Sequence, residues 1–81
     1  MPTVLRIEDF AFRFYSDEHE PPHIHCRNAD GVAVIEIETG NVLRTNGKIR
    51  DPDVRKAQAL VREHRKLLLT AWLKFALKKT R

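Results

Sequence analysis

Hydrophobic and polar residues alternate in the first part of the chain, which predicts β-strands. From residue 3 to residue 15 nearly every second side chain is apolar, and the acidic pair Glu8 and Asp9 interrupts the series. Since successive side chains of a strand point to opposite faces, this pattern predicts a β-hairpin with its turn at the acidic pair. The predicted buried face consists of Leu5, Ile7, Phe10, Phe12 and Phe14.

A second hairpin is predicted further along the chain. Asn, Ala, Asp and Gly at positions 28–31 are typical turn residues, and they separate a third strand that begins near His23 from a fourth strand over 32–38. The fourth strand alternates between two faces, as expected of an antiparallel sheet that is buried on one side. Its predicted core positions are Ala33, Ile35 and Ile37.

The remainder of the chain is predicted to be a connection followed by a helix. Residues 39–50 contain two glycine turns around the apolar pair at 42–43, which we interpret as a connection that can hold one short edge strand. Over 52–79 apolar residues recur at spacings of three and four, the period of an α-helix, with Asp51 as the expected cap and Pro52 at the first position. The helical stripe is formed by Val54, Ala57, Val61, His64, Leu68, Ala71 and Phe75.

These elements together predict an α+β fold. A small antiparallel sheet of about four strands, in two hairpins over residues 3–44, would be covered by one long C-terminal helix or by two consecutive helices. One domain spanning residues 1–81 is expected, because a chain of this size supports a single core. The helical stripe is interpreted mainly as part of that core.

Composition narrows the class of protein. The chain has 42% hydrophobic and 32% charged residues, and no apolar run approaches the roughly 18 residues that a membrane span requires. The first residues show no secretory signal, and the single cysteine, Cys26, excludes an internal disulfide and a Cys-only zinc site. We therefore expect a cytoplasmic protein that contacts no membrane and carries no cofactor.

Charge is divided unevenly along the chain. Residues 1–54 contain six basic and ten acidic side chains, a net charge of −4, whereas residues 55–81 contain nine basic and one acidic, a net charge of +8. Clustered cations on the helix indicate contact with nucleic acid or with an acidic protein. A solvated helix face whose cations complement the helix dipole is the alternative. The candidate binding residues are Arg62, Lys66, Lys74 and Lys78.

Two histidines could carry chemistry. His23 and His25 are two residues apart on the predicted third strand, so both imidazoles leave the same face of the sheet. A metal-independent ribonuclease needs a base, an acid and cations for the phosphate charge, and a face of His, Arg and Glu can supply them. Either histidine could be base or acid, while a purely structural role for both stays open. The candidate catalytic residues are His23, His25, Arg13, Arg27 and Glu20, and Arg6, Tyr15 and Glu36 are expected on the same surface.

Metal binding is an alternative function for this region. His19, His23 and His25 cluster with Glu18 or Glu20 within eight residues, and imidazole with carboxylate suits zinc. The two prolines at 21–22 limit how far His19 could approach His25, and this weighs against such a site. His64 and Cys26 are interpreted as a hydrogen-bonded boundary histidine and a buried filler.

Residues 20–25 read Glu-Pro-Pro-His-Ile-His, and with this string the chain resembles a small bacterial family, domain of unknown function 4160. The resemblance extends over nearly the whole length, through residues 1–7, the aromatic strand 10–16, and the helical segments 61–65 and 71–72. Family members commonly have Val where this chain has Cys26, and the basic end from Lys74 runs past their usual stop.

The resemblance implies a setting for the protein. Such chains are often encoded beside another short protein, and the pairs resemble toxin–antitoxin modules in which this chain is the candidate toxin. The leading hypothesis is therefore a toxin that a small antitoxin-like partner neutralises and that acts on RNA through the histidine face. The alternatives are a non-enzymatic nucleic-acid or protein-interaction module that uses the basic helix, and a metal-binding protein. Leucines in excess of a single buried stripe also predict a homodimer or a partner-bound chain: Leu67, Leu69, Leu73 and Leu77.

Overall fold

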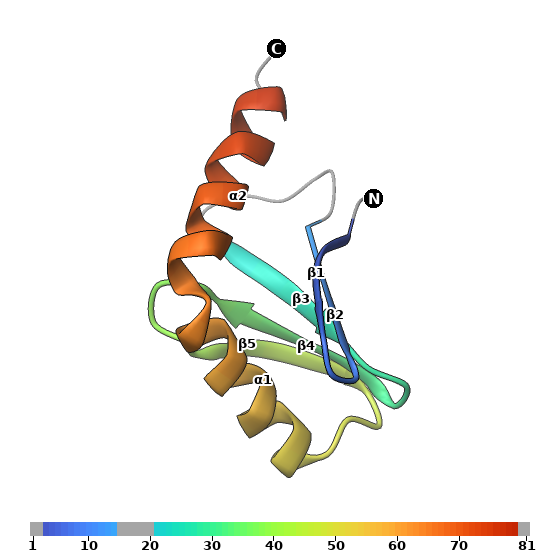
Figure 1. The fold of residues 1–81 in the computed structure, drawn as a ribbon. Coiled ribbons are helices and arrows are strands. Elements are labelled where there is room, and N and C mark those ends of the chain that lie inside the picture. The colour runs from blue at the N-terminus through green and yellow to red at the C-terminus, as the bar shows by residue number, and fades with distance from the viewer. Residues whose placement is uncertain (1–2, 15–20, 80–81) are drawn as a thin grey trace.

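The computed structural model describes residues 3–14 and 21–79, and their side chains from 5 to 14 and from 21 to 75. Within these ranges five strands form one antiparallel sheet in the order β1-β2-β3-β4-β5, and two helices follow (Figure 1). The α+β class is thus confirmed, with five strands rather than about four. The elements are β1 (Thr3–Ile7), β2 (Phe10–Arg13), β3 (His23–Arg27), β4 (Gly31–Glu36), β5 (Val42–Gly47), α1 (Asp51–Glu63) and α2 (Arg65–Lys79).

Both predicted hairpins are present. The β1–β2 turn lies at Glu8 and Asp9, where Glu8 adopts a left-handed backbone conformation with φ 54°. The carboxylate of Glu8 pairs with the Lys56 ammonium of α1, which raises the pKa of that lysine and links the turn to the helix layer. In the β3–β4 turn, Asn28 Oδ1 accepts hydrogen bonds from the backbone N–H groups of Asp30 and Gly31, at 2.9 and 3.0 Å. The β3–β4 turn is therefore built by a side chain that suits it, whereas Glu8 adopts a backbone conformation that residues other than glycine adopt rarely.

The fifth strand is longer than the sequence predicts. β5 lies at the edge of the sheet, and all six of its residues are exposed. Only Val42 and Leu43 are apolar, so the strand shows no alternation beyond its first two positions. The preceding turn closes where the Gly40 N–H donates to Glu36 O at 2.8 Å, and Gly40 itself has φ 77°.

The helical region consists of two helices placed end to end, which decides between the two predicted arrangements. His64 separates them, yet the His64 N–H donates to Leu60 O and the Leu68 N–H to His64 O, so backbone hydrogen bonds continue across the junction. The predicted cap is wrong: Asp51 is the first helical residue, and Arg50 occupies the cap position without a side-chain hydrogen bond. Asp51 still favours the helix start, because a negative charge complements the positive end of the helix dipole.

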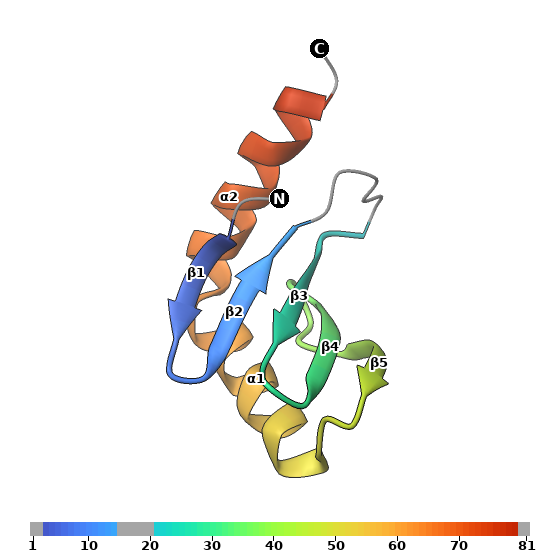
Figure 2. The same ribbon diagram turned by 90° about the vertical axis from the view of Figure 1, so that its right-hand side faces the viewer.

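The core lies between the helices and one face of the sheet (Figures 1 and 2). Trp72 of α2 stacks edge-to-face on Phe14 with ring centroids 5.4 Å apart. The second half of α2 projects beyond the end of the sheet (Figure 1). The buried cluster contains Phe10, Phe12, Phe14, Ile24, Cys26, Ala33, Ile35, Ile37, Ala57, Leu60, Val61, Leu68 and Trp72.

None of the helices in the described part of the chain is long and apolar enough to cross a membrane.

Candidate functional site

The face of the sheet opposite the helices carries most of the candidate catalytic residues. Strand register places Arg13 of β2 beside His25 of β3, His25 beside Val34 of β4, and Val34 beside Arg44 of β5. Directly opposed residues on one face have Cβ atoms roughly 4.5–5.5 Å apart, so these four side chains form one continuous row across four strands. An arginine stands at each end of the row. We call the surface that contains it the open sheet face.

A second row runs beside the first. Arg6 of β1 opposes Ala11 of β2, and Ala11 opposes Arg27 of β3. The small alanine leaves a shallow hollow between the two arginines, and Arg13 also lines it. The two residues of the β1–β2 turn, Glu8 and Asp9, line it as well. Three guanidinium groups from three strands therefore surround one depression of the open sheet face.

His23 lies at the end of the sheet, next to both the helix layer and His25. Its Nδ1 is 2.7 Å from Pro21 O, so in the neutral ring Nδ1–H donates to this carbonyl and Nε2 carries the lone pair. The ring centroids of His23 and His25 are 5.9 Å apart, and the indole of Trp72 lies 5.6 Å from His23 on its other side. The backbone and the indole thus fix the orientation of this imidazole.

His25 is less accessible than a strand alternation alone implies. It is 7% exposed, and its neighbour Val34 is 1% exposed, although both point away from the helices. The sequence analysis expects a solvated face here. The structure instead buries the middle of the row, at His25 and Val34.

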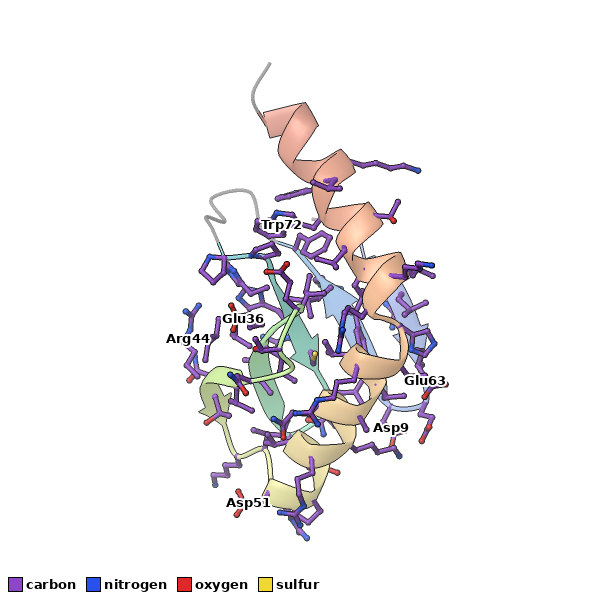
Figure 3. All side chains as sticks on the ribbon, turned by 90° about the vertical axis from the view of Figure 1, so that its left-hand side faces the viewer. Asp9, Glu36, Arg44, Asp51, Glu63 and Trp72 are labelled. Carbon is purple, nitrogen blue, oxygen red and sulfur yellow. The ribbon has the colours of Figure 1, made fainter. Side chains whose placement is uncertain are left out.

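Carboxylates are almost absent from the strands of the open sheet face. Glu36, which opposes His23 across the β3–β4 pair, accepts a hydrogen bond from Thr39 Oγ1 at 2.7 Å. Figure 3 shows Glu36 and Arg44 near one lateral edge of the molecule, whereas Asp9 and Asp51 lie in the lower part of the view. Among the described residues, the acidic side chains of the N-terminal part therefore lie largely in turns and at the helix start, while arginines from four strands share one face.

The candidate residues of the basic helices are not part of this site. Arg62 lies on α1, where its guanidinium group is close to Gly40 of the β4–β5 turn. Lys66 and Lys74 are exposed on α2 and line one shallow hollow together. Lys78 belongs to α2 but lies outside the described side chains. The chain thus presents two basic surfaces, one on the sheet and one on the helix layer.

The predicted site is incomplete in the structure. Glu20, the candidate orienting carboxylate, lies outside the described residues, as do His19 and Glu18 of the metal hypothesis. Within residues 3–14 and 21–79 no three His, Cys, Asp or Glu side chains come together as metal ligands. His64 Nδ1 is 3.0 Å from Leu60 O, so this ring is engaged at the helix junction.

Sequence reasoning missed two members of the site. Arg44 is not among the candidate residues, because residues 39–50 are interpreted as a connection with at most a short edge strand, and β5 extends through Arg44 to Gly47. Trp72 is not among the candidate site residues, because its contact with His23 depends on how α2 docks, which no local pattern specifies.

Comparison with known proteins gives one match. A family model described as a domain of unknown function, DUF4160, matches residues 10–73. Neither a curated protein nor a solved structure matches the chain. The matched range runs from β2 into α2 and includes His23, His25, Arg13 and Arg27.

Proposed function

Since the chain belongs to the DUF4160 family, whose description assigns no activity, we propose a function from the site itself: the protein binds single-stranded RNA on the open sheet face and cleaves the phosphodiester backbone there. One observation carries the proposal. Four strands contribute an arginine each to the face that also holds the His23–His25 pair. The four are Arg6, Arg13, Arg27 and Arg44.

The arginines account for binding. Phosphate contacts from cations supply most of the sequence-independent affinity for nucleic acids, and the planar guanidinium also stacks on unpaired bases. Sheet faces bind single strands in several RNA-binding folds, because an extended strand can lie across them. Residues two apart on a β-strand are separated by roughly 6.6 Å, and this is the distance between the row that contains Ala11 and the row that contains Arg13. It suits the extended sugar-phosphate backbone of a single strand.

The histidine pair accounts for cleavage. A base removes the proton of the 2′-hydroxyl, the 2′-oxygen forms a bond to phosphorus, and the bond to the 5′-oxygen breaks as an acid donates a proton to it. The products are a 2′,3′-cyclic phosphate and a 5′-hydroxyl. We assign the base to His25, which stands directly beside Arg13 in the row, and the acid to His23, which is the more exposed of the two rings. Arg13 would stabilise the negative charge on phosphorus.

This activity fits the two-protein setting that the family resemblance implies. In that setting the chain is the toxin-like component, and a small antitoxin-like protein neutralises it. DNA lacks the 2′-hydroxyl that the reaction needs, so RNA is the substrate class.

Binding is tested with a short fluorescent RNA of mixed sequence. We expect Arg27→Gln to weaken binding by about tenfold, because it removes one of the three guanidinium groups that line the hollow of the open sheet face. Arg55→Gln, an exposed arginine on α1, is the matched control and should bind as the wild type does. Equal loss in both variants would contradict a specific role for the sheet.

Cleavage is tested on end-labelled RNA in the presence of a chelator. His23→Ala should lower the rate at least about a hundredfold, the usual contribution of a general acid, while His64→Ala serves as the matched histidine control. An RNA with one 2′-deoxy position should resist cleavage at that position. A wild-type protein that binds RNA but leaves it intact would reduce the function to binding alone.

A further inference from the structure

Helix α2 carries exposed apolar residues that the core does not use. Leu68 and Trp72 point into the core and are buried, whereas Leu67 is 47% exposed. Leu67 and Ala71 are four residues apart, so they lie on one line along the helix surface. Ala71 is half-buried and packs against the core cluster, so Leu67 is the exposed end of this line.

A line of polar and basic residues runs beside the apolar one. Lys66, Thr70 and Lys74 follow each other at spacings of four, and with Leu67 and Ala71 they line a shallow hollow on α2. We call these five residues the Leu67 groove. An apolar line bordered by lysines is the complement of an amphipathic helix that has acidic residues next to its apolar stripe.

The charge of this part of the chain selects among partners. Residues 64–81 contain six basic and no acidic side chains. A second copy of the chain placed on this groove would bring lysines against lysines, which disfavours self-association. An exposed leucine in the middle of the groove contributes little to contact with phosphates, which disfavours nucleic acid.

We propose that the Leu67 groove docks an acidic amphipathic helix of a partner protein. Leucine or similar side chains of that helix would cover Leu67 and Ala71, and its carboxylates would face Lys66 and Lys74. The groove lies on the helix layer and the arginine rows on the opposite face of the sheet, so this proposal does not depend on RNA binding.

The test uses a synthetic helical peptide with leucines along one stripe and glutamates beside it, labelled for fluorescence anisotropy. The same residues in scrambled order form the control peptide. We expect the full-length protein to bind the amphipathic peptide at least about tenfold more tightly than the scrambled one, since only the former matches both lines of the groove.

Two pairs of variants locate the binding. Leu67→Gln should weaken it about tenfold, while Leu43→Gln on β5, where the leucine is 46% exposed, should not. Lys74→Glu should weaken it strongly at low salt and less at high salt, because salt screens exposed charges, and Lys48→Glu is the matched control. Circular dichroism confirms that each variant is folded.

Other occupants would overturn the proposal in recognisable ways. Concentration-dependent dimerisation that Leu67→Gln abolishes would assign the groove to a second copy. Binding of RNA that Lys74→Glu abolishes and Leu67→Gln leaves intact would assign it to nucleic acid. Binding of phosphatidylserine vesicles in preference to the peptide would assign it to a lipid surface. Equal affinity for the two peptides would also reject the proposal.

Discussion

Cys26 shows how one buried residue ties stability to pH. It lies in the central strand β3, between its cross-strand neighbours Phe12 and Ala33, and is closed to solvent. Burial raises the pKa of its thiol from 9.0 to about 12, because the thiolate would lose its hydration. The same burial excludes Cys26 as a nucleophile at neutral pH.

We expect the folded state to lose stability above pH 9 on account of this residue. Between pH 9 and pH 12 the thiol of the unfolded chain ionises while that of the folded chain stays protonated, so the unfolded state binds fewer protons and the free energy of unfolding falls as pH rises. Below pH 9 the thiol is protonated in both states, and its contribution to the free energy of unfolding is complete. The slope is about 1.4 kcal/mol per pH unit in this window.

This effect is measured by urea unfolding of the wild type and of Cys26→Ala at several pH values between about 8 and 10.5. The variant removes the thiol and so corrects for every other group that titrates there. The two stability curves should converge with rising pH. Curves that stay parallel would show that the thiol ionises as easily in the folded protein as in the unfolded chain.

At the scale of the elements, the β4–β5 pair depends on close backbone approach at Gly31. Gly31 opens β4 and pairs with Gly47, and a Cβ at Gly31 would overlap the carbonyl oxygen of Asn46 on the neighbouring strand. That oxygen belongs to the backbone and cannot turn aside as a flexible side chain does. The approach of the two strands is therefore compatible only with glycine at this position.

Gly31→Ala is expected to destabilise the protein by about 1–3 kcal/mol, the range for a strained backbone site. Amide exchange along β5 should accelerate more than in β1, because the damage is local to the edge. Thr45→Ala, which removes atoms from exposed β5 without adding any, is the control. An unchanged unfolding midpoint would mean that the edge strand adjusts at no cost.

The sequence predicts those elements that have one buried face. β1 to β4 and both helices follow from alternation or helical spacing, because burial selects apolar residues at every second or every third to fourth position. β5 is predicted only in part, because Arg44, Thr45 and Asn46 are exposed on an edge, where no burial selects apolar residues. The cap prediction was wrong by one position, since Asp51 suits both a cap and a first turn.

The candidate site was predictable only in part for a related reason. Strand alternation places His23, His25, Arg13 and Arg27 on one face, as the register confirms. It does not tell how deeply each lies, because the exposure of His25 depends on neighbours from other strands. The contact of His23 with Trp72 joins segments about fifty residues apart and follows only from tertiary packing.

At the scale of the whole molecule, cations occupy two separate surfaces, and salt can distinguish them. The affinity of a single strand for a protein falls with rising salt in proportion to the number of phosphates contacted, with a slope of about −0.7 per contact. If RNA lies on the open sheet face, Arg27→Gln should make this slope shallower by about 0.7, while Lys74→Gln leaves it unchanged.

Binding titrations of one RNA at several salt concentrations supply the slopes. The comparison is matched, since both variants remove one exposed cation from an ordered element. The opposite result, a shallower slope for Lys74→Gln alone, would move the RNA from the sheet to α2.

The strand order β1-β2-β3-β4-β5 has a consequence for how the chain is made. Every strand pairs with its neighbours in sequence, so the sheet has short-range contacts that form early and fast. The helices that cover its aromatic side are synthesised afterwards, from Asp51 onward. Until they emerge from the ribosome, Phe10, Phe12 and Phe14 lie on an uncovered sheet, the kind of surface that chaperones bind and that aggregates when translation stalls. Arrival of α1 and α2, rather than formation of the sheet, is then the step that makes the nascent protein safe from aggregation.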